Sequence, residues 1–365
     1  MTSRQMKISE LKPGMIVAEA LRRNDKLILQ QNTVLTANII RSLSHWGVEA
    51  ARVKLEIPTT VGQSAGRSHL SAMVREQLIE EDPGFFEKYS EATDLAGKLF
   101  HHMRHREDVP YKELYKLATE NLYELAMEKK ALGNLYKLKP YADYTYLHAV
   151  GVGIVSGLIG MWNGLKDDAV KKLILAGLMH DIGKSQIPLH ILDKPGKLTP
   201  DEQKTMNLHP QYGFYMTKSL PGIPPEVQQA ILQHHERENG SGYPAKLTGP
   251  QTHLFAKIVA ISDVYDALTT DKVYQKSVTP FKATEIFMDT MFATLDRDLC
   301  KIFIRHVLHD LIGGTVLLSD GTQAEVMEMS SFMSALPVVV NANRVIIDLN
   351  RHPQLSIIEV LKFGA

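Results

Sequence analysis

Cysteine is almost absent from this sequence, since Cys300 is the single one in 365 residues. One cysteine excludes a disulfide framework and a metal cluster held by thiolates, and it fits a reducing cytosol. An excess of charge is also missing, because 41 basic residues balance 41 acidic residues. Bulk electrostatic attraction to a nucleic-acid polymer or to an anionic membrane is therefore excluded, and any phosphate binding must be local.

Long apolar runs are missing as well. The longest run, from Tyr146 to Trp162, is shorter than a membrane span and contains His148, so it predicts a buried helix. The opening segment MTSRQMKISE has no apolar stretch of the kind that a secretory signal needs. We therefore expect a cytoplasmic protein with no membrane partner.

The pattern along the chain predicts a mainly α protein with a β-containing part at each end. Residues 1–57 mix short β-type runs, turn signals and one helix-like segment, which predicts a small α+β module. Residues 58–68 have the Pro, Gly and Ser content of a linker. Residues 69–310 show helical spacing almost throughout. Residues 311–365 predict a short β appendage, in which the Asp-Gly dipeptide at 320–321 favours a tight turn.

Histidines and acids collect in the helical part, inside apolar helices or at helix ends. The segment LAGLMHDIGKSQIP places His180 and Asp181 where an apolar run stops, with Lys184 three residues later. A single histidine or acid in such a place is often no more than a core histidine, a helix cap or part of a solvated face. A carboxylate or imidazole that is buried, however, needs a partner. The full set is His148, His180, Asp181, His209, His234, His235 and Asp263.

The size and chemistry of this set predict a metal centre. So many buried imidazoles are improbable without a metal, and nitrogen and oxygen donors without sulfur suit iron, manganese, zinc, cobalt or nickel. Seven ligands exceed what one ion takes from a protein while keeping an open position, so two ions are the economical interpretation. Asp181, with two carboxylate oxygens, is the natural bridge between them.

Four separated motifs then identify a family. HDIGK, NLHP, HHERENGSGYP and ISDVYDALTTDKVY occur in this order and resemble the HD-GYP family, the bacterial cyclic-dinucleotide phosphodiesterase branch of the HD superfamily. The resemblance covers residues 140–310, so residues 69–139 are predicted to be connecting helices. It implies a first metal held by His148, His180, Asp181 and Asp263, and a second held by Asp181, His209, His234 and His235. It also matches Lys184 to the lysine of the extended motif, and Gly242, Tyr243 and Pro244 to the name-giving tripeptide.

The resemblance implies hydrolysis of a 3′,5′-cyclic dinucleotide, with cyclic di-GMP converted to linear pGpG and further cleavage to GMP left open. Two divalent ions, with iron or manganese preferred and zinc, nickel or cobalt as alternatives, would activate a bridging hydroxide beside Asp181. Lys184 would neutralise charge on the phosphoryl oxygens or protonate the leaving oxygen. Tyr243 would stack on substrate or bind its phosphate, within a loop given backbone freedom by glycine.

Departures from the family pattern concern substrate rather than metal. Lys272, Val273 and Gln275 replace the usual arginine, proline and second basic residue, and Glu238-Asn239 replaces an aromatic residue and an aspartate. Fewer phosphate contacts leave three alternatives open: a cyclic-dinucleotide receptor with negligible turnover, a phosphodiesterase acting on cyclic GMP-AMP, and an HD-type nucleotidase. The tripeptide loop and the double histidine speak against the nucleotidase.

Three further expectations concern the number of ions and the assembly. Some family members carry a glutamate four residues before the first histidine, where this chain has Tyr144, a poor ligand for a hard metal. We therefore expect two ions, with Tyr144 beside the site or touching substrate. Asp266 and Asp271 are predicted to be surface or capping groups. The helices within residues 84–130 offer a seam for a homodimer.

Overall fold

The computed structural model describes residues 3–11, 15, 17–23, 26–29, 35, 40, 43, 48–54, 82–104, 111–138, 144–194, 196–270, 277–290, 293–331 and 334–364. The predicted linker over 58–68 lies outside these residues, as does most of the helix-like segment of the N-terminal module. The chain forms two compact units. One comprises the chain up to Met73 together with Ile187–Met206, and the other comprises Val74–Gln186 and Asn207–Ala365.

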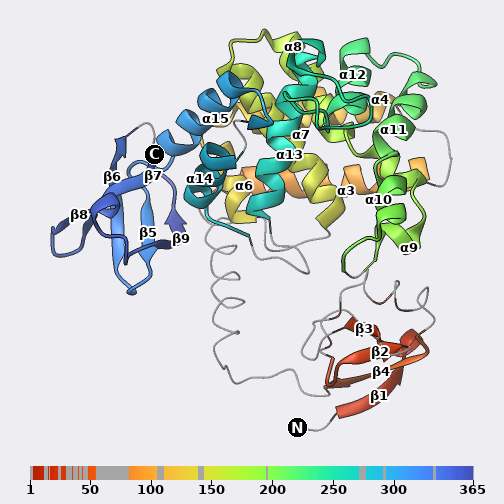
Figure 1. Ribbon diagram of the computed structural model, residues 1–365, viewed down its shortest axis with the longest axis horizontal. Helices are drawn as coiled ribbons and strands as arrows, with labels where there is room; N and C mark the ends of the chain where they lie inside the picture. Colours follow the sequence, from red (N-terminus) through yellow and green to blue (C-terminus); the bar gives the residue numbers. More distant parts are fainter. Residues whose placement is uncertain are drawn as a thin grey trace. The chain divides into compact units, whose positions relative to one another are not determined.

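The first unit contains two antiparallel strand pairs. β1 (Ser3–Lys7) pairs with β4 (Ala50–Lys54), and β2 (Leu21–Arg23) pairs with β3 (Lys26–Leu29). Their apolar side chains form a small core of their own. The short helices α9 (Leu189–Leu192) and α10 (Pro200–Met206) belong to the same unit. The four strands are drawn in red and orange at the lower right of Figure 1, and α9 and α10 are drawn in green at its right-hand side.

The second unit is built from helices, which confirms the mainly α class predicted from the sequence (Figure 1). Its helices are α3 (Pro83–Arg104), α4 (Tyr111–Lys116), a π-helical stretch (Leu117–Leu122), α5 (Tyr123–Met127), α6 (Ala131–Leu138), α7 (Tyr144–Trp162), α8 (Asp167–Met179), α11 (His209–Lys218), α12 (Pro225–Gln233), α13 (Leu254–Thr269), α14 (Pro280–Thr290) and α15 (Arg297–His309).

Helix α7 is the centre of this unit and is the buried helix expected from the apolar run. It packs against α3, α8 and α13, and its apolar residues are enclosed almost completely. Glycine allows the close crossing of α7 and α8, because a Cβ atom on Gly177 would lie 2.8 Å from the Cα atom of Gly153. Two helix backbones can approach this closely only where side chains are absent. The crossing fixes the end of α8 beside His148.

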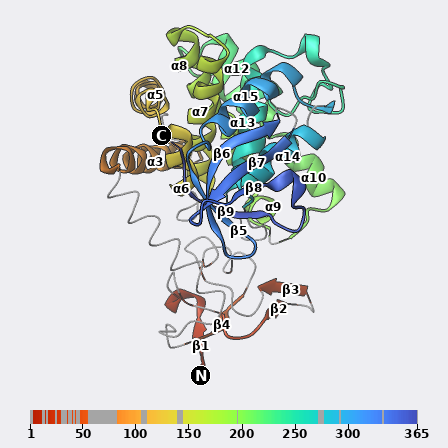
Figure 2. The same cartoon turned by 90° about the vertical axis from the view of Figure 1, so that its left-hand side faces the viewer.

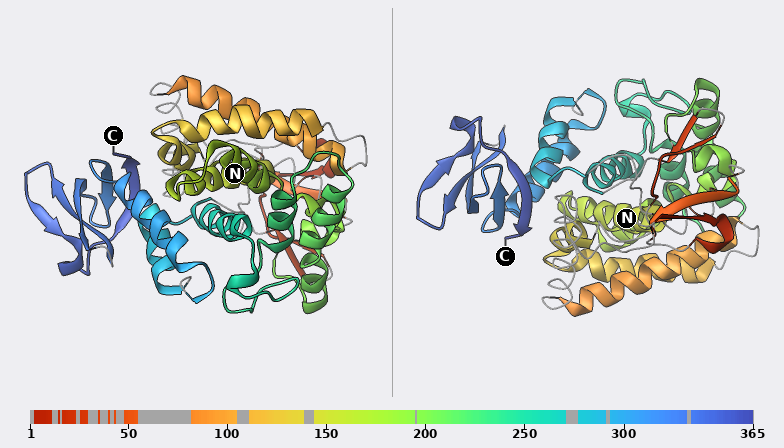
Figure 3. Two further views of the ribbon diagram at one scale, coloured as in Figure 1. Left: turned by 90° about the horizontal axis from the view of Figure 1, so that it is seen from above. Right: turned by 90° about the horizontal axis from the view of Figure 1, so that it is seen from below.

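The C-terminal residues form the β appendage that the sequence predicts. Strands β5 (Thr315–Leu318), β6 (Gln323–Ser331), β7 (Ser334–Asn341), β8 (Ile346–Asp348) and β9 (Ile357–Lys362) make one antiparallel sheet in the order β8-β7-β6-β5-β9. Gly321 at φ +87° completes the expected turn between β5 and β6. Figures 2 and 3 show this sheet beside α15 at one end of the helical unit.

The sheet is not an independently packed body. Its buried side chains belong to the same hydrophobic core as the helices, and the ring of Phe363 lies against Gly133 of α6 so closely that a Cβ atom on Gly133 would be 2.8 Å from it. The subdivisions predicted at residues 140 and 311 therefore fall inside one continuous core. These domain bounds stay predictions.

Candidate metal centre

The seven predicted ligands come from five different helices of the second unit. His148 lies in the first turns of α7, and His180 and Asp181 follow directly after α8. His209 begins α11, His234 and His235 follow α12, and Asp263 lies within α13. Helix ends and the interiors of two apolar helices are the positions that the sequence indicates for these residues. The structure brings all seven together.

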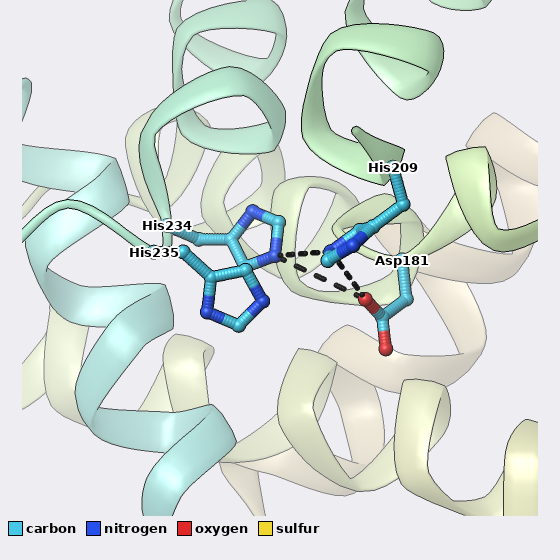
Figure 4. Close-up of side chains that lie close together, drawn as sticks. All are labelled: Asp181, His209, His234 and His235. Carbon is cyan, nitrogen blue, oxygen red and sulfur yellow. Dashed lines mark hydrogen bonds and ion pairs between the residues drawn. The ribbon is translucent and has the colours of Figure 1, made fainter. Parts of the chain in front are cut away.

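The ligand atoms form two groups. In each group these atoms lie within 4.8 Å of one another. The groups are His148, His180 and Asp263, and Asp181, His209, His234 and His235. Figure 4 shows the second group, with Asp181 and His209 facing the two histidines that follow α12. This cluster of histidine and aspartate donors could bind divalent metal ions.

Asp181 contacts both groups. Its Oδ1 atom lies 3.2 Å from His209 Nε2 and 3.9 Å from His234 Nε2, whereas its Oδ2 atom lies 3.3 Å from His180 Nε2 and 3.8 Å from His148 Nε2. One oxygen is therefore turned toward each group. The position is the one that a carboxylate bridging two ions requires.

The orientation of two imidazole rings tests whether a cation fits here. His180 Nδ1 lies 2.7 Å from the carbonyl oxygen of Gly177, and His234 Nδ1 lies 2.8 Å from that of Ile231. A carbonyl oxygen only accepts, so each Nδ1 carries a proton and each ring turns its Nε2 atom toward the cluster. His180 Nε2 is buried and makes no hydrogen bond within the described part of the chain. Asp181 Oδ1 is buried without a hydrogen bond to the described residues as well, and a divalent cation ligated by such atoms would satisfy them.

The protonation states favour cation binding. Burial holds the pKa of His234 well below its usual value and lowers the pKa of His235 to about 3, so both rings are neutral at pH 7. Burial acts to raise the pKa of Asp181, but its contacts with His180 and with the ammonium group of Lys184 hold that pKa well below its usual range. Neutral imidazoles and ionised carboxylates are the forms that ligate metals.

His148 differs from the other rings. Burial acts to lower its pKa, but hydrogen bonds to Asp263 and Asp266 outweigh burial and raise the pKa to about 9. Without a cation this ring is an imidazolium between two carboxylates, with Nε2 3.2 Å from Asp263 Oδ1 and Nδ1 2.8 Å from Asp266 Oδ2. A metal ion at Nε2 must displace a proton, which makes binding in this group pH-dependent.

Lys184 lies beside the cluster and contacts Asp181 directly through Oδ2. The short 3₁₀ helix Ile182–Gln186 places it there, and Gly183 makes the turn possible. A Cβ atom on Gly183 would lie 1.9 Å from the carbonyl oxygen of His209. The glycine therefore lets the turn that carries Asp181 press against the start of α11.

The loop that contains the predicted tripeptide lies against the second group. Tyr243 stacks on His235 with ring centroids 4.6 Å apart and planes 27° apart. Gly242 has a packing role, because a Cβ atom there would lie 2.4 Å from the carbonyl oxygen of His235. The substrate roles predicted for Gly242, Tyr243 and Pro244 stay predictions.

Two residues contribute in ways that the sequence reasoning did not predict. Asp266, predicted to be a surface or capping group, is 2 % exposed and accepts from His148, so that prediction is wrong. Glu236 is also buried, and its carboxylate accepts from the backbone N–H groups of Ala245 and Leu247 at 2.7 and 2.9 Å. It closes the loop that holds Tyr243. The signal for Asp266 was its spacing of three residues from Asp263, which places both on one helix face.

Some predicted residues cannot be placed. Lys272, Val273 and Gln275, which bear on substrate phosphate, lie outside the described residues, as does Asp271. Tyr144 begins α7, but its side chain is not among those that the structure describes.

Across the described ranges, no helix has both the length and the apolar character to cross a membrane.

Comparison with known proteins agrees with this geometry. A family model described as an HD domain matches residues 125–299. A cyclic di-GMP phosphodiesterase from Pseudomonas aeruginosa is 32% identical over 281 residues, which cover 77% of this chain and 66% of that protein. The cyclic di-GMP phosphodiesterase response regulator RpfG from Xanthomonas campestris is 34% identical over 52% of this chain and 49% of its own. A 3′3′-cGAMP-specific phosphodiesterase from Vibrio cholerae is 32% identical over 52% of this chain and 43% of its own.

A solved structure matches the fold. Bd1817, a HDG"Y"P protein from Bdellovibrio bacteriovorus, aligns with a TM-score of 0.50 over 84% of this chain and 99% of its own, at 17% identity. The sequence relatives are longer proteins, since the matched regions span about two thirds of the first and less than half of the other two.

Proposed function

This chain belongs to the HD-GYP family of the HD superfamily, and from that premise we propose that it is a metal-dependent phosphodiesterase that hydrolyses a 3′,5′-cyclic dinucleotide. The observation that carries the proposal is the complete set of seven histidine and aspartate ligands in two groups, with Asp181 turned toward both. A binding protein without turnover has no need of such a set. The receptor alternative is therefore not favoured.

Two divalent ions fit the two groups, with iron or manganese preferred and zinc, nickel or cobalt as alternatives. The ligands His148, His180, Asp181 and Asp263 would hold the first, and Asp181, His209, His234 and His235 the second. When bound, such ions activate water near neutral pH and stabilise the charge of a phosphodiester during in-line displacement. A third ion has no anionic anchor at Tyr144. Metal analysis of protein purified from its own host tests both number and identity.

The chain's own groups would support the reaction in distinct ways. Asp181 and Asp263 are ionised, and the neutral rings of His234 and His235 each leave one nitrogen without a proton. Burial acts to lower the pKa of Lys184, but Asp181 outweighs burial and raises it, so the side chain is an ammonium at neutral pH. A fixed ammonium beside the bridging carboxylate can stabilise negative charge that develops on phosphoryl oxygens.

Cyclic di-GMP is the substrate that we propose, with pGpG as the first product. Two of the relatives described above are named for cyclic di-GMP and the third for 3′3′-cGAMP, so cyclic GMP-AMP is the competing substrate. The experiment is to incubate purified protein and Mn²⁺ with each dinucleotide and to separate the products by chromatography. We expect faster conversion of cyclic di-GMP to pGpG. Faster conversion of 3′3′-cGAMP would show that cyclic GMP-AMP is the preferred substrate. Binding of either dinucleotide without formation of product would favour the receptor alternative.

A homodimer formed through helices within residues 84–130 is a separate proposal. One face of α3 is already buried inside the chain, because Phe85, Tyr89 and Ala96 belong to the core. The opposite face is the one that a second copy would cover. Light scattering coupled to gel filtration measures the mass of the protein in solution. The mass of a monomer would exclude a homodimer formed through these helices.

A further inference from the structure

The ring of His148 is held at both of its nitrogens by one helix. Asp263 Oδ1 lies 3.2 Å from Nε2, and Asp266 Oδ2 lies 2.8 Å from Nδ1. The two carboxylates are three residues apart on α13, which puts them on the same face of that helix. Asp263 is in the proposed ligand set and Asp266 is not. Helix α13 therefore supplies one ligand and also a carboxylate that can orient the ring of His148.

The chain makes room for the second carboxylate. Asp266 is 2 % exposed, and Thr270 donates to its Oδ2 atom at 3.4 Å. On the other side lies Gly151 of α7, where a Cβ atom would be 2.6 Å from Asp266 Oδ1. Any larger residue at 151 would push the carboxylate away. Gly151 is three residues after His148, so both lie on the same face of α7. The helix therefore carries the imidazole ring and, next to it, the space that the Asp266 carboxylate occupies.

We propose that Asp266 is a positioning residue for the metal centre: it fixes the ring of His148 so that Nε2 faces the cation, and Gly151 supplies the space it needs. The inference rests on the metal centre of the proposed function. A carboxylate that accepts from the second nitrogen of a ligating histidine fixes its tautomer and raises its basicity as a ligand. Packing of the helices alone gives no reason to bury Asp266 beside His148, because burying a carboxylate costs free energy unless it is paired.

The test measures Mn²⁺ binding by the full-length chain in competition with a chelator, with electron paramagnetic resonance to distinguish coupled pairs from single ions. For Asp266→Ala we expect the affinity of the ion in the His148 group to fall by about 10–100-fold. The ion held by His209, His234 and His235 should remain, so the coupled signal should give way to that of a single ion. Asp266→Asn keeps an acceptor without the charge and should give a smaller loss.

A glycine substitution tests the same idea without touching a polar group. Gly151→Ala should weaken the same ion, because the new methyl group displaces the carboxylate. Gly160→Ala is the matched control in α7, since its Cβ atom would meet only aliphatic side-chain atoms, the nearest at 2.8 Å. Circular dichroism and thermal unfolding of the metal-free proteins separate local effects from unfolding. If Asp266→Ala fails to fold, the metal affinities of Asp266→Asn and Gly151→Ala test the positioning role in its place.

The possible failures are distinguishable. If wild-type protein binds two ions and both Asp266→Asn and Gly151→Ala bind them with wild-type affinity, the positioning role is wrong and the proposed function stands. Equal loss of both ions would also contradict it, because the role assigned to Asp266 is specific to one group. If wild-type protein binds no Mn²⁺ at all, the proposed metal-dependent function fails first.

Discussion

His209 Nε2 and His234 Nε2 lie 3.3 Å apart, although the two residues are 25 positions apart in the sequence and come from different helices. His234 Nδ1 donates to the backbone, so its Nε2 atom carries a lone pair at that distance. The Oδ1 atom of Asp181 lies at the same point, 3.2 Å from the Nε2 atom of His209 and 3.9 Å from that of His234. Convergence of this kind is what a bound cation stabilises, and it is produced by three helix segments: the end of α8, the start of α11 and the end of α12.

Asp181→Asn should weaken both ions, because the carboxylate is turned toward both groups. An amide offers one neutral oxygen where two charged ones were available. We expect a loss of at least one ion per chain after desalting, together with loss of turnover, as measured by elemental analysis. Asp289→Asn is the control, since that side chain is exposed on α14. Full metal content and normal rate in Asp181→Asn would exclude the site.

Lys184→Ala should separate chemistry from metal binding. The ammonium contacts Asp181 but is not a ligand, so both ions should remain while turnover slows by about two to three orders of magnitude, the scale of one transition-state charge contact. Lys301→Ala removes a lysine with the same spacing to an aspartate on the surface of α15 and should change neither. Metal loss in Lys184→Ala would assign the lysine to the metal site instead.

A second lysine anchors the loop that carries Tyr243. Lys257 of α13 lies 2.9 Å from Glu238 of that loop and 3.0 Å from Asp296, which caps the start of α15. Lys257→Met leaves two partly buried carboxylates without their cation and should lower the free energy of unfolding by about 1–3 kcal/mol. We also expect a higher KM for substrate at unchanged metal content.

The control for this change is Lys282→Met, which removes an exposed ion pair with Glu285. It should change stability by less than about 0.5 kcal/mol and leave KM unchanged. An unchanged KM in Lys257→Met, measured beside this control, would mean that the anchor stabilises the fold without affecting the loop.

Asp310, at the end of α15, predicts a pH-dependent stability. Burial raises the pKa of its carboxyl group from an ordinary 3.8 to about 6 in the folded protein. Between about pH 4 and pH 6 the folded state therefore holds a proton that the unfolded state has released, so this group's contribution falls as pH rises through that window. A negative charge is also unfavourable at a helix C-terminus.

Asp310→Asn should therefore stabilise the protein at pH 7, by about 1–2 kcal/mol after allowance for the 31% exposure of the side chain. The gain should shrink to a small remainder near pH 4, where the carboxyl group is protonated in the folded state and partly protonated in the unfolded state. Denaturant unfolding of both proteins at pH 4, 5, 6 and 7 measures the difference. A gain that is constant across this range would contradict the assignment.

The sequence was sufficient to predict the helical class, the C-terminal sheet and the members of the ligand cluster, because apolar spacing and ordered motifs are local signals. Asp266 was misassigned because a lone acid on a helix is usually exposed, and its partner His148 is 118 residues away. The role of Glu236 depends on two backbone N–H groups that become neighbours only after the loop closes. The core shared by helices and sheet is likewise a tertiary property, which no local pattern encodes.

The central claim is that two ions share Asp181, and anomalous diffraction from crystals grown with Mn²⁺ tests it most directly. We expect two anomalous peaks per chain, one among His148, His180 and Asp263 and one among His209, His234 and His235, with an oxygen of Asp181 coordinated to each. A single peak, a third peak near Tyr144 or no peak at all would contradict the binuclear centre.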